Sequence, residues 1–242
     1  MSQHAAASPS SAGMWMNCPA SVTLAEGLSR PSSKYAREGT AAHKIAEMII
    51  GGDPFPPPKI TVEGDEFIVS RDMLRHLNGY IDYVEKLAVL GDIYIETRVG
   101  LSLTNGLVWG TADCISVYAG LLQIVDLKYG KGVPVDPNSP QLKIYALAAM
   151  EHLNVFPTSI ALVVFQPRLD PDPKLHLMSV EALRSWAEDE LKPAVTALNK
   201  GSTKEVAGTW CRWCVRRDVC QAFAKKKSSI ASDSFDDGVD TT

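Results

Sequence analysis

Two aspartates and a lysine stand where a β-hairpin would bring them together. The chain on either side of Ala119-Gly120 alternates or is apolar, as paired strands are, and these two residues suit a tight turn. With the turn placed there, strand pairing sets Asp113 directly opposite Asp126, with Cβ atoms about 4.5–5.5 Å apart. Lys128 lies two residues beyond Asp126, so its side chain points to the same face of the sheet.

These three residue types suggest metal-assisted hydrolysis. Opposed like charges destabilise a sheet unless a cation lies between them. Carboxylate oxygens suit Mg²⁺ or Mn²⁺, hard ions that keep bound waters and also bind phosphate. A neighbouring lysine could position the attacking water and offset charge on a phosphate. From spacing alone, a surface hairpin with Asp–Lys pairing explains the pattern equally well.

The surrounding sequence predicts the elements that must position this hairpin. Helical periodicity and serine N-caps predict helices at about 35–50, 70–90, 140–153 and 180–200. Apolar or alternating runs predict strands at 92–99, 110–118, 121–128 and 159–166, with an edge strand at 174–179. This order predicts an α/β fold with a mixed central β-sheet flanked by helices.

Length and composition set the remaining limits. The 242 residues are 45% hydrophobic, which suits a single domain, expected over 14–224, between disordered segments at 1–13 and 225–242. The sequence has no long apolar run and no secretory signal, so we expect a cytoplasmic protein without membrane contact. The net charge is −4, so any nucleic-acid contact must be local. The lysines and arginines over 212–227 are either a solvated surface or phosphate contacts.

Four cysteines form a second set of potential ligands. Cys211, Cys214 and Cys220 follow a C-x2-C-x5-C pattern, and Cys18 supplies a fourth thiol. Disulfides are not expected in a cytoplasmic protein. Four thiolates suffice for an iron–sulfur cluster or for zinc. Either centre would join the two ends of the chain, which is a structural role.

Four motifs together resemble the RecB-like branch of the PD-(D/E)XK nucleases, which have a restriction-endonuclease-like core. Three of them are Gly110-Thr111-Ala112-Asp113, Asp126-Leu127-Lys128 and Gln141-xxx-Tyr145. The fourth is a histidine on an early helix, in Glu38-Gly39-Thr40-Ala41-Ala42-His43. Each motif is weak alone, but their shared order over residues 14–220 is specific. The whole chain is similar to phage-borne stand-alone nucleases of this branch.

The resemblance implies a set of metal ligands. His43, Asp113 and Asp126 would hold Mg²⁺ or Mn²⁺ with the backbone carbonyl of Leu127. Glu96 matches a family glutamate and would complete the metal shell. Asp126 departs from the many members that have glutamate at this position, which affects the expected metal preference. On its own, His43 on a helix of mostly Ala and Ile is better explained as a core histidine.

The resemblance also implies roles for the other motif residues. Lys128 would act on the nucleophilic water. Gln141 and Tyr145, four apart on one helix face, would steady the lysine or contact the DNA backbone. Taken singly, Tyr145 fits a core position and Gln141 an exposed first turn. Several members bind a 4Fe-4S cluster through one early cysteine and a late C-x2-C-x5-C, which favours this cluster over zinc.

We therefore expect a metal-dependent DNA nuclease, a PD-(D/E)XK deoxyribonuclease that works as an exonuclease. In a phage it would process DNA ends for recombination, beside a single-strand annealing protein. One alternative is a non-catalytic DNA-binding module that keeps the nuclease fold, against which the intact Asp–Asp–Lys set argues. Another is an iron–sulfur redox protein, but ferredoxin ligand spacings are tighter than one cysteine near residue 18 and three near 215.

Overall fold

The chain forms two compact units. The structure, a computed structural model, describes residues 5–25, 27–28, 31–53 and 55–236. Unit 1 comprises Met1–Pro9 and Pro31–Ser185, and unit 2 comprises Ser10–Arg30 and Trp186–Thr242. All residues of the predicted nuclease motifs lie in unit 1, and the four predicted cluster cysteines lie in unit 2. The expectation of one domain over 14–224 remains a prediction.

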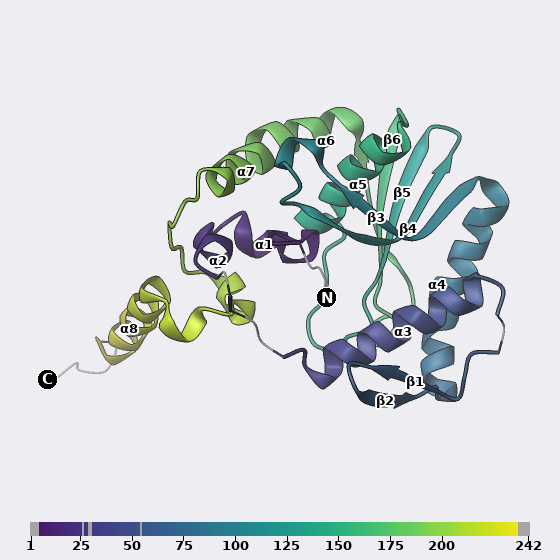
Figure 1. Cartoon of the computed structure of the whole chain (residues 1–242), viewed down its shortest axis with the longest axis horizontal. Helices are drawn as coiled ribbons and strands as arrows, with labels where there is room; N and C mark the ends of the chain where they lie inside the picture. The colour runs from purple at the N-terminus through teal and green to yellow at the C-terminus, as the bar shows by residue number, and fades with distance from the viewer. Residues whose placement is uncertain (1–4, 26, 29–30, 54, 237–242) are drawn as a thin grey trace, which may run out of the picture. The chain divides into compact units, whose positions relative to one another are not determined.

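Unit 1 contains a five-stranded mixed sheet in the order β3-β4-β5-β6-β7 (Figure 1). The strands are β3 (Asp92–Gly100), β4 (Trp109–Tyr118), β5 (Leu121–Leu127), β6 (Ser159–Phe165) and β7 (Lys174–Ser179). β5 pairs with β6 in parallel, and the other neighbours pair antiparallel. The predicted mixed α/β fold is confirmed.

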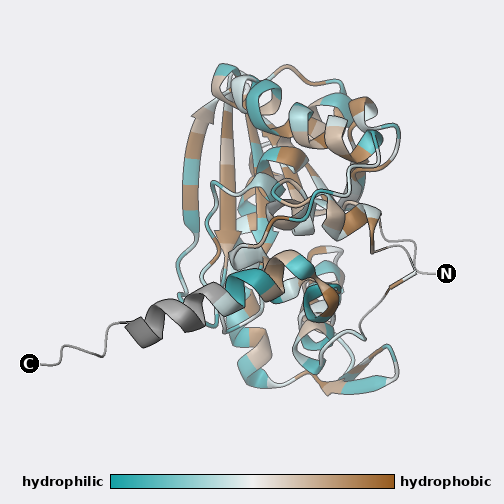
Figure 2. Ribbon diagram, turned by 90° about the vertical axis from the view of Figure 1, so that its left-hand side faces the viewer, coloured by the Kyte–Doolittle hydropathy of each residue, from teal (hydrophilic) through white to brown (hydrophobic). Residues whose placement is uncertain are grey.

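Helices cover both faces of this sheet. One face packs against α3 (Lys34–Ile50) and α4 (Arg71–Leu90) through a buried cluster that includes Cys114, Val125 and Leu127. The opposite face carries α5 (Pro140–Leu153), which contacts β3, β4, β5 and β6. Hydrophobic stretches run along the strands between these helices (Figure 2). Alternating side chains of one strand therefore face different helices, which decides where each motif residue points.

Serine caps begin the helices where the sequence predicts them. The hydroxyl of Ser33 accepts a hydrogen bond from Ala36 N–H, and that of Ser70 accepts one from Met73 N–H. Ser179 likewise caps α6 (Val180–Trp186). The predicted single helix over 180–200 is interrupted by a π-helical turn, η3 (Ala187–Leu191), before α7 (Lys192–Asn199). Pro193 lacks the N–H that a continuous helix needs at that point, which accounts for the irregular turn.

A small hairpin was missed by the sequence prediction. β1 (Lys59–Val62) and β2 (Asp65–Ile68) form a two-stranded sheet that packs on α3. Its turn residues, Glu63 and Gly64, have φ of 47° and 87°, which matches a two-residue hairpin turn. Strands of four residues beside a proline-rich run give too short a pattern to distinguish from loop.

Unit 2 joins residues from both ends of the chain. Its elements are η1 (Pro9–Ser11, mostly in this unit), α1 (Ala12–Trp15), α2 (Ala20–Thr23), η3, α7, η4 (Thr209–Trp213), η5 (Arg217–Val219) and α8 (Gln221–Asp236). Thr23 Oγ1 donates to the carbonyl of Ser202 at 2.7 Å, and Ala20 N–H to that of Lys204 at 3.4 Å. These bonds hold an early segment against one about 180 residues later.

Two segments of low apolar content carry helix. Composition predicts disorder over 1–13 and 225–242, which stays a prediction; the structure places η1 and part of α1 in the first segment and most of α8 in the second. Residues 1–4 and 237–242 of these two predictions lie outside the described residues. Among the residues described, no helix combines the length and apolar character needed to cross a membrane.

Candidate active site

The β4–β5 hairpin has the register that the sequence predicts. Both turn residues have positive φ, 46° and 81°, a turn whose twist matches that of the flanking strands. Pairing runs without a break from the turn to Cys114 and Val125. One position further along, Asp113 therefore lies across from Asp126. Asp126 faces α5, since Gln141 of that helix donates to it, whereas Asp113 lies just beyond the last strand pair, within reach of His43 of α3.

A third carboxylate joins this row from β3. The pairs between β3 and β4 on either side of Glu96 keep one register, so Glu96 lies across from Asp113. Glu96 has φ of 44°, a conformation that residues other than glycine rarely adopt. Such backbone strain persists only where the surrounding structure imposes it, and it is concentrated at functional sites. Three acidic side chains thus cross three adjacent strands in one row.

His43 meets two of these carboxylates from α3. Its Nδ1 lies 3.5 Å from Asp113 Oδ1 and 3.6 Å from Glu96 Oε1. One ligand atom from each of the three residues lies within 4.8 Å of the other two. In the part of the chain that the structure describes, no other three His, Cys, Asp or Glu residues come so close. An imidazole nitrogen and two carboxylates are a donor set that fits a divalent cation such as Mn²⁺ or Mg²⁺.

Asp126 is held by a different set of partners. Its side chain is only 3% exposed, and Lys128 Nζ lies 2.8 Å from Oδ1 and 2.7 Å from Oδ2. Gln141 donates its side-chain amide to Oδ1 at 2.8 Å. Oδ2 lies 2.7 Å from the Lys128 ammonium and accepts no other hydrogen bond, so one lone pair of this buried oxygen is left for a cation. Asp126 is not a member of the His43, Glu96 and Asp113 group.

Backbone contacts fix the end of β5. Asp113 Oδ2 accepts a hydrogen bond from Leu127 N–H at 2.7 Å, which ties the two strands together at the site. Lys128 N–H donates to the carbonyl of Phe165 at 2.7 Å, which continues the pairing with β6. The carbonyl of Leu127 as a metal ligand remains a prediction.

Tyr145 explains the glycine of the Gly110-Thr111-Ala112-Asp113 motif. α5 begins at Pro140, so Gln141 lies in its first turn and Tyr145 lies one turn further along the same face. A Cβ atom on Gly110 would come within 2.8 Å of Tyr145 Oη. A Cβ atom there would crowd this phenol and the ring of Pro9, so glycine lets Tyr145 lie beside β4 without a shift. The structure thus brings residues of all four predicted motifs together around Asp113 and Asp126 on β4 and β5.

Burial and close charges shift the pKa values of the central pair. Burial raises the pKa of Asp126, Lys128 lowers it and Asp113 raises it again, to about 6. For Asp113, burial also raises the pKa, but the charge and hydrogen bond of His43, the charge of Lys128 and the N–H of Leu127 together outweigh burial, so the pKa falls below its ordinary value. The pKa of Lys128 is raised because its two aspartate neighbours outweigh the effect of its burial. Lys128 therefore carries a full positive charge at neutral pH.

His43 is protonated at neutral pH when no metal is bound. Burial alone would lower its pKa, but Asp113 and Glu96 together raise it from 6.5 to about 10. A group whose pKa is raised by folding stabilises the protein fully below its unfolded pKa. This contribution is present below about pH 6.5 and is lost as pH rises through about 10. A metal ion that bound His43 would have to displace this proton.

We expect the affinity for Mn²⁺ to rise about tenfold per pH unit between pH 7.0 and 8.5, because one proton leaves His43 for each ion bound. Asp126 is largely ionised over this range and contributes little to the slope. Calorimetric titration of Mn²⁺ into the protein under oxygen-free conditions measures this affinity at each pH. His43→Asn should bind more weakly and with a shallower slope. Lys44→Ala, an exposed change on the same helix, should leave the slope unaltered. A pH-independent affinity in the wild-type protein would exclude His43 as a ligand.

Two residues after β6 were missed by sequence reasoning. Gln166, 5% exposed, accepts a hydrogen bond from one backbone N–H of the loop 129–139 and donates to two of its carbonyls. Arg168 pairs with Glu38 at 2.9 Å and lies over the ring of Tyr129, 4.8 Å from its centroid. They order the loop between Lys128 and Gln141 and link it to α3. The only sign of Gln166 in the sequence is that this polar amide directly follows the apolar strand 159–165.

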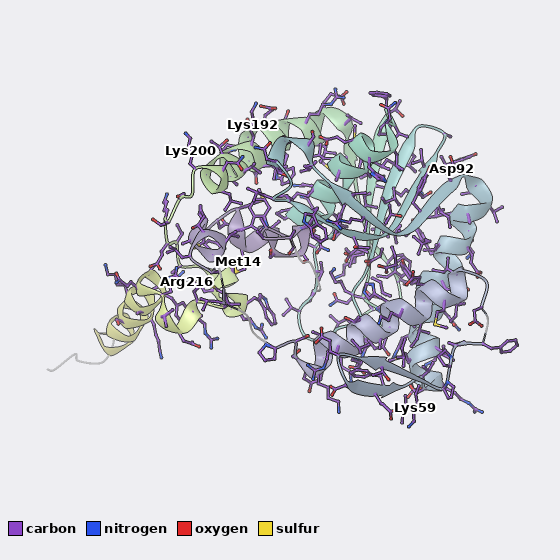
Figure 3. The ribbon with its side chains drawn as sticks, viewed as in Figure 1. Met14, Lys59, Asp92, Lys192, Lys200 and Arg216 are labelled. Atoms are coloured by element: carbon purple, nitrogen blue, oxygen red, sulfur yellow. The ribbon has the colours of Figure 1, made fainter. Side chains whose placement is uncertain are left out.

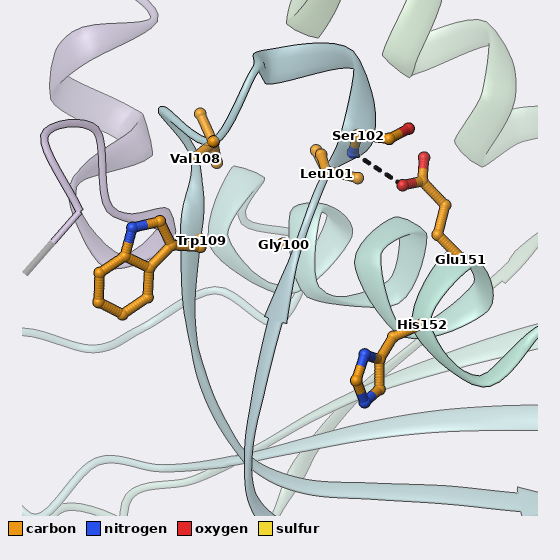
Figure 4. Close-up of a pocket in the computed structure, with 8 residues that line it drawn as sticks. Gly100, Leu101, Ser102, Val108, Trp109, Glu151 and His152 are labelled. Atoms are coloured by element: carbon orange, nitrogen blue, oxygen red, sulfur yellow. Dashed lines mark hydrogen bonds between the residues drawn. The ribbon is translucent and has the colours of Figure 1, made fainter.

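A separate hollow of about 390 Å³ lies where β3 leads into β4 (Figure 4). Its lining includes Leu101, Val108, Trp109 and His152, and Ser102 N–H donates to Glu151 at its rim. None of its lining residues belongs to the row of carboxylates. We therefore assign no part of the candidate chemistry to this hollow.

The fold and site define a class: an α/β protein whose mixed sheet carries a candidate divalent-metal centre of two carboxylates and a histidine, beside a buried Asp–Lys pair. The chain belongs to the family described as "Protein of unknown function (DUF2800)", whose model matches residues 4–241.

Two solved structures show remote similarity. One is a candidate exonuclease from Eubacterium rectale, with 14% identity and a TM-score of 0.39, covering 73% of this chain and 71% of that one. The other is SSO0001, with 14% identity and a TM-score of 0.35, covering 83% of this chain and 93% of that one. At TM-scores below 0.5, neither similarity bears on the function of this chain.

Proposed function

We propose that this protein is a metal-dependent deoxyribonuclease of the RecB-like PD-(D/E)XK type that acts as an exonuclease. One observation carries the proposal: the carboxylates of Glu96, Asp113 and Asp126 form a row across three strands, with His43 at one side and Lys128 at the other. Packing alone does not account for three acidic side chains in one row of a sheet.

His43, Glu96 and Asp113 would hold the divalent ion, and the buried oxygen of Asp126 has capacity to join them. A bound Mg²⁺ or Mn²⁺ would supply charge stabilisation at the phosphate and lower the pKa of the attacking water. Lys128 places a fixed positive charge beside Asp126, where it can orient the water and stabilise charge that develops on the phosphate. Gln141 holds Asp126 in the orientation that keeps this ammonium in place.

The direct test uses protein purified without oxygen and end-labelled DNA, single- and double-stranded, with Mn²⁺ or with EDTA. We expect nucleotides to be released only with Mn²⁺, and Asp126→Ala to be inactive. If DNA binds but no form of it is cut, the chain is a non-catalytic DNA-binding module. Circular DNA left intact while linear DNA is degraded would support an exonuclease over an endonuclease.

We further propose that Cys18, Cys211, Cys214 and Cys220 bind a 4Fe-4S cluster with a structural role. Burial raises the pKa of Cys214, the N–H of Arg216 lowers it, and the other three thiols are near enough to raise it further. Backbone N–H groups point at two of the sulfurs, from Val206 to Cys18 and from Gly208 to Cys211, both at 3.3 Å. Such hydrogen bonds to sulfur are typical of cluster ligands.

The ligand pattern favours the cluster over zinc. Zinc sites are more often built from two paired cysteine knuckles, and only Cys211 and Cys214 form such a pair here. Cys18 is also tied by hydrogen bonding to the backbone of residues 204 and 206.

Cys214→Ser is expected to remove the brown colour and to lower stability, because one of four ligands is lost and the two ends of the chain are no longer joined. Visible absorbance, iron content and thermal unfolding measure the effect on protein prepared without oxygen. Cys114→Ala, which changes a buried cysteine of the sheet, should keep the colour. A colourless wild-type protein that contains zinc would overturn the assignment. Redox-dependent activity would favour a redox role instead.

The proposed activity suits a phage protein that resects DNA ends in the cytoplasm of its bacterial host. A nuclease of this kind would generate single strands for a separate annealing protein, which is the partner that the resemblance implies. Co-purification with such a protein, encoded beside it, would test this partnership.

A further inference from the structure

The C-terminal part of unit 2 is strongly basic within an acidic protein. Residues 208–228 contain six lysines and arginines and one acidic residue, whereas the whole chain has a net charge of −4. The basic residues are Arg212, Arg216, Arg217, Lys225, Lys226 and Lys227. Arg216, labelled in Figure 3, pairs with Glu205 at 3.2 Å, and Arg217 pairs with Asp218 at 3.1 Å. Positive charge is therefore concentrated in this segment, which begins with η4.

An exposed indole stands in the same segment. The side chain of Trp213 is 68% exposed. Arg212 lies over its ring, with the guanidinium carbon 4.9 Å from the ring centroid. Trp210, three residues earlier, is half-buried and donates its indole N–H to the carbonyl of Val206 at 2.9 Å. Trp210 therefore stabilises the turn through its hydrogen bond, whereas the indole of Trp213 is left exposed to solvent.

The backbone that presents Trp213 is firmly held. Cys211 and Cys214, on either side of the Arg212-Trp213 pair, are 6% and 8% exposed. Glu205 accepts from both Arg216 and the N–H of Ala222, and this ties the segment before η4 to the starts of η5 and α8. A large aromatic group held out from a fixed turn has little conformational entropy to lose on binding.

We propose that Trp213 and Arg212 form a stacking platform for an unpaired base of single-stranded DNA, with the neighbouring lysines and arginines contacting its phosphates. An aromatic face accepts any base, but it requires a base that is not already stacked inside a duplex. The surrounding positive charge favours a polyanion over an apolar protein surface. The proposal rests on the proposed function only in taking DNA as the substrate.

Fluorescence anisotropy tests the platform in full-length protein with EDTA, so that no cleavage occurs. The probes are a labelled thymidine oligonucleotide of about 20 nucleotides and a blunt hairpin duplex. Trp213→Ala should weaken binding of the single strand about tenfold or more, because a stacked base is lost, and should affect the duplex much less. Trp213→Phe should retain most of the affinity. Val219→Ala, an exposed apolar change in the same segment, should have no effect.

Salt dependence separates stacking from charge. Trp213→Ala should leave the slope of affinity against salt unchanged, whereas Arg212→Ala should reduce it. Equal losses for single strand and duplex, or no loss for Trp213→Ala in a folded variant, would overturn the platform. Trp213-dependent binding without any Mn²⁺-dependent cleavage would reject the proposed nuclease function and leave the platform standing. Mn²⁺-dependent cleavage together with unchanged DNA binding by Trp213→Ala would support the nuclease function and reject the platform.

Discussion

Lys128→Ala is expected to lower the rate of DNA cleavage by at least about 10²–10³-fold while DNA binding persists. The ammonium lies 2.7 Å from Asp126 Oδ2 and is held charged by two aspartates. It is the cation of the described residues closest to the buried carboxylate, so its loss removes the charge beside the proposed phosphate position. Single-turnover cleavage with saturating Mn²⁺ measures the rate, and anisotropy in EDTA measures binding.

Two further variants sharpen this result. Lys128→Met keeps most of the side-chain volume and should be as inactive as the alanine variant, which separates charge from packing. Lys131→Ala removes an exposed lysine three residues along the chain and should retain most of the activity. Without Lys128, the pKa of Asp126 should rise above its present value of about 6, so the carboxyl takes up a proton instead of remaining buried and charged. Cleavage within a few-fold of wild type would remove Lys128 from the mechanism.

Asp113→Asn is expected to weaken Mn²⁺ binding by at least about 100-fold. Asp113 is central to the proposed metal site: it contacts His43 at 3.5 Å, accepts from Leu127 N–H, and lies between Glu96 and Asp126 in the row. The asparagine keeps the shape and can still accept from Leu127, so the change removes charge with little effect on packing. Calorimetry measures the loss directly.

Thermal unfolding gives a second measure that does not depend on activity. An ion at 100 times its Kd stabilises a folded protein by about 2.7 kcal/mol. For a chain of this length that corresponds to an increase in Tm of about 5–10 °C. Wild-type protein should show this increase with Mn²⁺, and Asp113→Asn should not. Asp92→Asn, an exposed acid at the start of β3, should behave as wild type. An undiminished increase in the Asp113 variant would place the metal elsewhere.

The β4–β5 hairpin could be predicted because its information is local. A two-residue turn fixes the register of both strands, and the period of two fixes which side chains share a face. This register predicts that Asp113, Asp126 and Lys128 lie close together. The serine caps of α3 and α4 are predictable for the same reason, because their hydrogen bonds are local. The fold class followed from the order of helical and alternating runs.

Only the tertiary structure determines that His43, Glu96 and Asp113 come within reach of one another. The sequence of α3 does not predict which strands the helix approaches. The contacts of His43 with Glu96 and Asp113 depend on packing between elements that are far apart in the chain. The left-handed backbone of Glu96 is imposed by its surroundings, and a glutamate in an alternating run predicts ordinary strand geometry. The resemblance indicated these residues as ligands, but their distances come from the fold.

The same distinction holds for the separation of Asp126 from that group. The sequence predicts two opposed aspartates that share an ion, whereas the structure binds Asp126 to Lys128 and Gln141. The division into two units and the exposure of Trp213 likewise depend on packing across the whole chain. Local spacing determined which side chains face one another across a hairpin. Long-range packing, in which each contact depends on many others, determined which of them meet His43 and which remain buried with a lysine.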